Sequence, residues 1–350
     1  MSNYRIFGSE LSPYSVKVRS YFRYKGLPHD WIPRSPAVQA EFQKYAKLPL
    51  VPLVVTPPGA NGESEGVQDS TPIIERFEAA RGEPSIVPED PALAFISALL
   101  EEYGDEWGNK WMFHYRWRYQ PDAWSTAERI AQQMMGAQGT LAVAQARATV
   151  AERMMGRLGF VGSNDGTRPT IEASFKRALG LLEAHLQARP YMLGGRPAMA
   201  DFGLWAQFYE AATDPTPGAI MRSSSPKVME WVQRMVSPEA EGPFESWSAL
   251  APTLMPLLKE EVGALFLPWS AANAAAIERD DKSFEMTLGG AAWSQEPQKY
   301  HARSLAEIRR KYAAAKGAAG LETILKESGC LPFLDREQLA LSLPKGPARS

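Results

Sequence analysis

The sequence contains a single cysteine, Cys330, among 350 residues. One cysteine forms no internal disulfide and supplies no zinc cluster, so the pattern favours a reducing compartment. The four histidines have no metal-ligand spacing to one another or to the cysteine. We therefore expect neither a disulfide scaffold nor a metal centre.

Other absences exclude further classes of protein. Lys and Arg total 38 and Asp and Glu total 40, a net charge of −2, so the basic excess typical of nucleic-acid-binding proteins is lacking. No run of about 18 apolar residues predicts a transmembrane helix, and no basic stretch followed by an apolar one predicts a secretory signal. No G-x-G-x-x-G or P-loop pattern implies a nucleotide cofactor. We expect a cytoplasmic protein that binds neither nucleic acid nor membranes.

The first 82 residues have the pattern of a small α/β domain with a mixed sheet. Apolar spacing and helix start and stop signals distinguish the strands from the helices. In order, they predict a strand at 4–7, a helix from Ser12-Pro13 to Gly26, a strand at 29–33, a helix at 37–45, strands at 50–55 and near 67, and a helix capped by Ser70 and closed by Gly82.

After a proline-containing linker at 83–91, almost every periodic segment is helical. Apolar residues from Ile171 to Leu186 recur at helical spacing, and the nearly all-apolar segment 202–212 predicts a buried helix. We predict an all-helical domain at 90–240. Residues 241–350 are predicted to form a helical extension packed on that domain, with an extended pattern at 283–290.

Three short segments near the N-terminus have the residues of an anion-binding site. Ser12 offers a hydroxyl at a helix start, where unpaired backbone N–H groups and the helix dipole stabilise an anion or a thiolate. Pro52 stands inside an apolar strand, which fits a cis bond that turns the backbone of Val51 toward a ligand. Asp69 and Ser70 begin a second helix and suit an ammonium and a carboxylate. Taken singly, Ser12 is explained by a plain N-cap, Pro52 by an edge strand or a bulge, and Asp69 with Ser70 by a plain helix cap.

Together with the helical part, these segments resemble the glutathione transferase superfamily. The resemblance is best over 1–82 and extends to about residue 236 through 191–202, which is similar to the family's motif before the buried helix of its second domain. The family usually has Ser or Thr three residues before Asp201, where this chain has Ala198, so one bond of a capping box is absent at a cost of about 1 kcal/mol. The resemblance implies a thioredoxin-like N-terminal domain and an all-α C-terminal domain, as in longer bacterial members.

The resemblance also implies glutathione as co-substrate, a homodimer, and a role for each matching residue. Ser12 takes the place of the hydroxyl that holds the glutathione thiolate in serine-type members, so exchange through a sulfur of the enzyme itself is not expected. The resemblance further implies that Val51, beside Pro52, contacts the cysteinyl backbone of glutathione. It implies that Asp69 and Ser70 hold the γ-glutamyl group and that Lys47 meets the glycyl carboxylate.

An aromatic run at 103–119 is the candidate wall of a pocket for a planar, apolar co-substrate. Domain packing and a dimer interface explain such a run equally well. Arg116 and Arg118 in this run are candidates for binding a substrate carboxylate. The pocket candidates are Tyr14 near the first helix start and, on one helical face, Trp107, Trp111, His114 and Tyr115.

We predict a glutathione transferase that activates the thiolate at Ser12 for attack on an electrophilic, apolar or aromatic small molecule. One alternative is a non-catalytic binding or scaffold protein that reuses the fold, favoured by the unassigned residues 241–350. Another is a glutathione-dependent lyase or ether-cleaving enzyme for aromatic compounds, favoured by the aromatic run.

Overall fold

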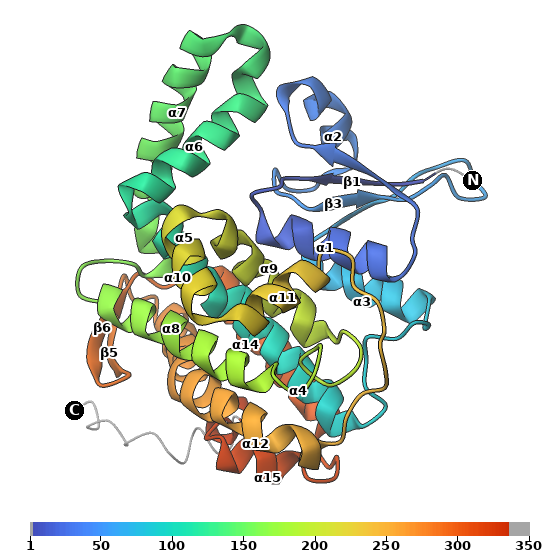
Figure 1. Ribbon diagram of the computed structural model, residues 1–350, viewed down its shortest axis with the longest axis vertical. Coiled ribbons are helices and arrows are strands. Elements are labelled where there is room, and N and C mark those ends of the chain that lie inside the picture. Colours follow the sequence, from blue (N-terminus) through green and yellow to red (C-terminus); the bar gives the residue numbers. More distant parts are fainter. Residues whose placement is uncertain (1–2, 336–350) are drawn as a thin grey trace.

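The structure is a computed structural model that describes residues 3–335. Its N-terminal part is a mixed four-stranded sheet in the order β2-β1-β3-β4, in which only the β1–β2 pair is parallel. Helices α1 and α3 cover one face of the sheet and α2 covers the other (Figure 1). The elements are β1 Tyr4–Gly8, α1 Pro13–Tyr24, β2 His29–Pro33, the 3₁₀ turn η1 Pro36–Val38, α2 Gln39–Tyr45, β3 Leu53–Val55, β4 Gly66–Gln68 and α3 Ser70–Ala80.

The predicted order of strands and helices in this part is confirmed, with two corrections. The strand predicted at 50–55 begins only at Leu53, because residues 50–52 lie outside the ladder. Asp69 rather than Ser70 is the N-cap of α3. Successive side chains of a strand point to opposite faces of the sheet, so β1 contributes to the packing on both faces. Ile6 packs in the core beside α1 and α3, whereas Phe7 packs with Phe42 of α2.

The helical part surrounds α9, which carries the segment predicted as a buried helix and lies at the centre of the fold (Figure 1). A helical hairpin of α6 and α7 projects from this part beside the sheet. The elements are α4 Pro91–Glu102, the π-helix η2 Tyr103–Gly108, α5 Asn109–Arg118, α6 Gln120–Met135, the 3₁₀ turn η3 Gly136–Gln138, α7 Thr140–Met155, the 3₁₀ turn η4 Leu158–Val161, α8 Arg168–His185, α9 Met199–Thr213, α10 Pro215–Ser224 and α11 Pro226–Arg234.

Asp201 fixes the start of α9 in the absence of a capping hydroxyl. Its carboxylate accepts hydrogen bonds from the backbone N–H of Ala198 and of Met192 and from Nε1 of Trp231, each at 2.9 Å. The bond from Ala198 was predicted. The other two donors compensate for the missing serine or threonine, since they satisfy the buried carboxylate from outside the helix.

The predicted extension is not wholly helical. Residues 284–295 form a hairpin, because Gly289 and Gly290 take φ of 60° and 81° in its two-residue turn. Helix α14 then lies along α4 and α13. Residues 336–350 lie outside the described residues. The elements are α12 Trp247–Leu257, the π-helix η5 Leu258–Phe266, α13 Leu267–Glu278, β5 Phe284–Leu288, β6 Ala291–Gln295, α14 Lys299–Ala315, α15 Leu321–Glu327 and α16 Leu331–Leu334.

A buried polar chain joins this extension to the helical part. Nε1 of Trp107 and Nε1 of Trp111 donate to Oγ of Ser174 at 2.8 and 2.9 Å, and Ser174 donates to Glu261 of η5. Tyr103 also donates to Glu261, at 2.9 Å. Glu261 of the extension therefore accepts hydrogen bonds, directly or through Ser174, from the buried polar groups of these aromatic side chains.

Glu261 gives the stability of the fold a defined pH dependence. Burial raises the pKa of Glu261 from 4.5 to about 7. Between pH 4.5 and about pH 7, Glu261 is protonated in the folded state but ionised in the unfolded state. The contribution of Glu261 to the free energy of unfolding therefore falls as pH rises through this range. We expect Glu261→Gln to flatten the fall in the free energy of unfolding between about pH 5 and pH 8, measured by urea denaturation. The exposed Glu296→Gln should leave the slope as it is; equal slopes for wild type and Glu261→Gln would contradict the assignment.

Within residues 3–335, no helix combines the length and the apolar character needed to cross a membrane.

Candidate functional site

The register of the sheet brings the three predicted segments to one end of it. β1 leads into Ser12, and β3, antiparallel to β1, begins directly after Pro52. β4 is antiparallel to β3, with Leu53 paired to Gln68, and Asp69 follows. Because β1, β3 and β4 are neighbours in the order of the sheet, the three segments lie side by side at this end.

Ser12 combines the two roles considered for it from the sequence. It is the N-cap of α1, with Pro13 as the first helical residue, and its Oγ accepts a hydrogen bond from the backbone N–H of Ser15 at 3.3 Å. An accepting hydroxyl keeps its own proton, so Ser12 is also able to donate to an anion at the helix start. The predicted cap is confirmed, and the contact with a thiolate stays a prediction.

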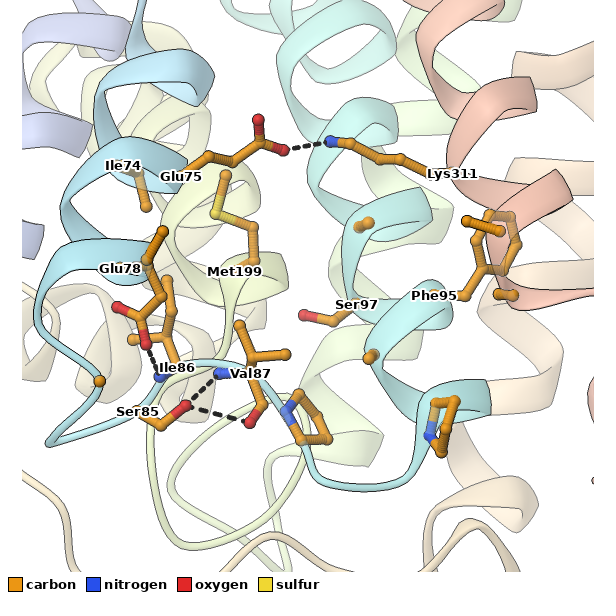
Figure 2. Close-up of a pocket in the computed structure, with 18 of the residues that line it drawn as sticks. Ile74, Glu75, Glu78, Ser85, Ile86, Val87, Phe95, Ser97, Met199 and Lys311 are labelled. Atoms are coloured by element: carbon orange, nitrogen blue, oxygen red, sulfur yellow. Dashed lines mark hydrogen bonds and ion pairs between the residues drawn. The ribbon is translucent and has the colours of Figure 1, made fainter. Parts of the chain in front are cut away.

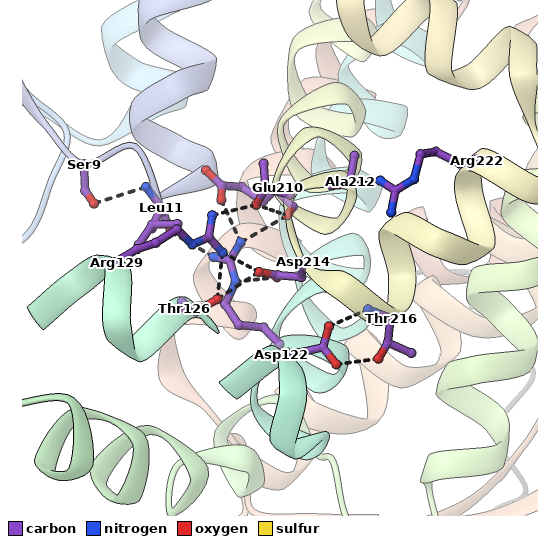
Figure 3. A network of polar contacts seen from close by, with 12 residues as sticks. Ser9, Leu11, Asp122, Thr126, Arg129, Glu210, Ala212, Asp214, Thr216 and Arg222 are labelled. Atoms are coloured by element: carbon purple, nitrogen blue, oxygen red, sulfur yellow. Dashed lines mark hydrogen bonds and ion pairs between the residues drawn. The ribbon is translucent and has the colours of Figure 1, made fainter. Parts of the chain in front are cut away.

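Arg116 supports the loop that carries Ser12. Its Nη1 donates to the backbone oxygen of Leu11 at 3.0 Å, while its other nitrogens contact Glu210 and Asp214, each at 2.7 Å. Figure 3 shows Leu11 of the loop close to Glu210 and Asp214. Arg116 is 2% exposed. Arg116 is therefore a structural residue, and its interpretation as a ligand of a substrate carboxylate is wrong. Arg118 instead pairs with Asp165.

The loop before Pro52 is fixed by the side chain of Gln68, which sequence reasoning missed. Oε1 of Gln68 accepts from the backbone N–H of Lys47 at 2.7 Å and of Leu48 at 3.0 Å, and Nε2 donates to the backbone oxygens of Leu48 and Leu50 at 2.8 Å. The Val51–Pro52 bond is cis, as predicted. Gln68 could have been suspected from the sequence, because it ends a predicted strand and directly precedes the candidate residue Asp69.

Asp69 has an unusual backbone conformation, with φ of 76°. This left-handed region is tolerated best by Gly, Asn and Asp, so the position restricts the residue type. Its carboxylate does not cap α3. Loss of hydration raises the pKa of Asp69, Lys17 opposes the rise, and Glu101 adds to it. Ser70 is buried at the first turn of α3.

A buried ion cluster lies beneath this end of the sheet. Lys17 of α1 contacts Glu101 of α4 and, at 2.6 Å, Asp105 of η2, and it reaches Oγ1 of Thr71 at 3.2 Å. Burial raises the pKa of Asp105 to about 8 although Lys17 opposes the rise. Oδ1 of Asp105 has no hydrogen-bond partner among residues 3–335. The sequence contained a signal, since Lys17 stands between the apolar residues Val16 and Val18 of the predicted helix.

Four of the five residues predicted to line a substrate pocket belong to the core instead, and the fifth, Tyr14, is half-buried and donates its hydroxyl to the backbone oxygen of Asp105 at 3.0 Å. The indole of Trp107 packs against rings of α13 and β6 in the extension, whereas Trp111 and Tyr115 pack against a ring of α8. The pocket interpretation is wrong for these four residues, because other helices and the extension cover them. The core residues are Trp107, Trp111, His114 and Tyr115, each at most 2% exposed.

One cavity lies away from the predicted residues. It has a volume of about 700 Å³ and opens between α3, the linker, α4 and α14 (Figure 2). Its wall is mainly apolar, with Phe95 and Met199 among the lining residues, and the ion pair between Glu75 and Lys311 stands at one side. Cavities of this size and character hold apolar small molecules, and Ser12 is not among the residues that line this one.

A second cavity, of about 420 Å³, adjoins Asp69. Its floor is formed by the N-terminus of α3 and by η2, and its outer wall is α14. The lining residues are mostly acidic: Asp69, Glu75, Glu102, Asp105, Glu106 and Glu307, with Arg303 as the basic residue. Within residues 3–335, no group of three or more His, Cys, Asp or Glu side chains is arranged to hold a metal ion.

Two family models match the chain. Residues 6–85 match the model described as glutathione S-transferase, N-terminal domain, and residues 142–234 match that described as glutathione S-transferase, C-terminal domain. Residues 235–350 lie outside both matches. No curated protein matches the chain.

Several solved structures match part of the chain. A glutathione S-transferase from Methylobacterium radiotolerans, in complex with glutathione sulfonate, is 19% identical, with a TM-score of 0.41 over 70% of this chain and 97% of that chain. A glutathione S-transferase from Rhodospirillum rubrum is 15% identical, with a TM-score of 0.43 over 86% and 99%. A β-etherase from Sphingobium sp. is 17% identical, with a TM-score of 0.42 over 67% and 95%.

Proposed function

The chain belongs to the glutathione S-transferase superfamily, and we propose that it binds glutathione along the end of the sheet and activates its thiolate at Ser12. The acceptor of the thiolate is an electrophilic, apolar or aromatic small molecule. We propose that residues 1–82 form the glutathione-binding domain, residues 90–240 the all-helical domain and residues 241–350 an extension packed on it. The homodimer and the cytoplasmic location stay predictions.

One observation carries this proposal: the ends of β1, β3 and β4 lie side by side. Neighbouring strands are about 4.8 Å apart, so the two intervals from β1 to β4 measure about 10 Å. An extended tripeptide is also about 10 Å long. A glutathione placed across these ends would put its sulfur at Ser12, its cysteinyl backbone at Val51 beside Pro52, and its γ-glutamyl group at Asp69 and Ser70. Lys47, exposed on the loop that Gln68 fixes, would meet the glycyl carboxylate.

The chemistry assigned to Ser12 is the stabilisation of a thiolate. A free thiol has a pKa of about 8.5, so little is ionised at neutral pH. Lowering this pKa by about two units requires roughly 2.7 kcal/mol of preference for the anion. The hydroxyl of Ser12 and the N-terminus of the 12-residue helix α1 both favour the anion. The thiolate then attacks the electrophilic carbon and displaces its leaving group.

A glutathione-binding protein without catalysis is the second candidate, and one observation favours it. The aromatic residues expected to hold the electrophile are buried, and neither of the two cavities described above is lined by Ser12. The same burial removes the support that the aromatic run gave to the lyase or ether-cleaving alternative.

Calorimetric titration with glutathione tests the proposal. We expect binding to the wild type and a rise in Kd of about tenfold in Asp69→Asn, because one charge-assisted hydrogen bond to the ammonium is lost. Asparagine tolerates the positive φ at this position, so the backbone is kept. Asp30→Asn, at an exposed residue of β2, should bind as the wild type does. Absence of binding at millimolar glutathione would reject both candidate functions.

A further inference from the structure

The cavity beside Asp69 is closed on its outer side by α14, a helix outside both family matches. Most polar groups of α14 near this cavity already have partners. Ser304 donates to Glu102 and His301 contacts Glu106, while Lys311 pairs with Glu75 at 2.7 Å. These contacts fix α14 against α4, η2 and α3, so the cavity is bounded by elements from distant parts of the chain.

Asp69 is the acceptor on the inner side of the cavity that is left to bind a donor. It lines the cavity, and its carboxylate does not cap α3. Asp105 lines the same cavity, but burial raises its pKa to about 8, so it is mainly protonated at neutral pH and offers little negative charge to a ligand. The carboxylate of Asp69 suits a ligand with several N–H donors, such as an ammonium group.

Arg303 offers the opposite chemistry from the outer wall. Its side chain is exposed and makes no hydrogen bond or ion pair with residues 3–335, although it lines an acidic cavity. The neighbouring Arg310, in contrast, pairs with Glu307 at 2.6 Å. A guanidinium has donors only, and its preferred partner is a carboxylate. The cavity is therefore lined by a carboxylate-binding group, Arg303, and by an ammonium-binding group, Asp69.

We propose that α14 completes the γ-glutamyl site, with Arg303 binding the α-carboxylate of glutathione and Asp69 binding its α-ammonium. An α-amino acid terminus carries these two charges on one carbon, which fits a cavity of about 420 Å³ lined by both kinds of group. The inference rests on the proposed function, because that function brings the γ-glutamyl end to Asp69. It assigns a ligand-binding role to the C-terminal extension.

The test compares Arg303→Gln with a matched variant, Lys326→Gln, which removes the same charge from α15, outside the cavity. Calorimetry measures Kd for glutathione and for an analogue in which the α-carboxylate of the γ-glutamyl residue is a carboxamide. We expect Arg303→Gln to weaken the binding of glutathione by about tenfold or more, as for loss of a charged hydrogen bond. The analogue should bind the wild type and Arg303→Gln equally weakly. Unchanged melting temperatures establish that both variants are folded.

The outcomes separate this inference from the proposed function. If the wild type binds glutathione and Arg303→Gln binds it as tightly as Lys326→Gln does, the role of Arg303 is overturned and the proposed function stands. If Arg303→Gln weakens the binding of glutathione and of the carboxamide by the same factor, Arg303 acts away from the carboxylate and the inference is likewise wrong. If the wild type binds no glutathione, the proposed function fails, and this inference with it.

Discussion

Ser12→Ala is expected to lower kcat/KM for an electrophilic aryl halide by about 10- to 100-fold and to leave the Kd for glutathione nearly unchanged. The hydroxyl would donate a charge-assisted hydrogen bond to the thiolate, and such bonds contribute about 1.5–3 kcal/mol. The contacts assigned to the peptide part of glutathione lie on other strands and remain. Ultraviolet titration of the bound thiol should show its pKa moving toward the value of about 8.5 for a free thiol.

Ser15→Ala is the matched control for this substitution. Ser15 lies in the same first turn of α1, but its hydroxyl is buried and has no partner among the described residues. Its removal should leave turnover as in the wild type, whereas Ser12→Thr, which keeps a hydroxyl, should restore part of it. Because Ser12→Ala also loses an N-cap, worth about 1 kcal/mol, rates are compared well below the melting temperature. Full turnover in Ser12→Ala would remove Ser12 from the proposed mechanism.

Lys17→Met is expected to destabilise the fold by about 3–5 kcal/mol, the largest effect on stability that we predict. Lys17 is fully buried and is the cation that contacts Glu101 and Asp105. Methionine has a similar length and fills the space, but it leaves the ionised Glu101 without this counterion and removes the hydrogen bonds to both carboxyl groups. Urea denaturation measures the change, and the same cluster joins α1 to α4 and η2, so glutathione binding at the adjoining site should weaken as well.

The pH dependence of this loss tests its electrostatic cause. Burial acts to raise the pKa of Glu101, but Lys17 overcomes this effect and holds the pKa below its usual value. Without Lys17, burial raises that pKa, so Glu101 of the variant is protonated and neutral at lower pH. The difference in stability between the wild type and Lys17→Met should therefore shrink as pH falls from about 8 to about 5. Replacing all three residues by apolar ones of similar size should recover most of the loss. A difference that stays constant with pH would point to packing instead of charge.

Local signals were sufficient for much of the fold. Ser12 before Pro13 placed the start of α1, and apolar alternation placed the strands of the sheet. These signals act over a few residues, through capping and side-chain periodicity, so they can be found in one sequence. The turn at Gly289 and Gly290 belongs to the same class, although only an extended pattern was predicted for its first strand.

The candidate site was predicted in part, and the error at the aromatic run shows the limit. Helical spacing correctly places Trp107 and Trp111 on one face, but spacing does not reveal what covers that face. Both indoles donate hydrogen bonds to Oγ of Ser174, and Ser174 donates in turn to Glu261. Glu261 lies on η5, more than 140 residues away from the indoles in the chain. An amphipathic face has the same pattern whether it borders a cavity or a second layer of helices.

The sequence by itself determined the family, the order of elements in the α/β part, and the three segments whose residues suit an anion, because each depends on contacts between neighbours in the chain. Only the tertiary structure decided which of the acidic and basic residues are neutralised. Lys17 has two carboxylates, Arg116 is enclosed by Glu210 and Asp214, and Arg303 makes no pair within residues 3–335. Whether a charged side chain is paired depends on its burial and on its neighbours in space. Long-range packing sets both, and the residues next to it in the sequence do not reveal them.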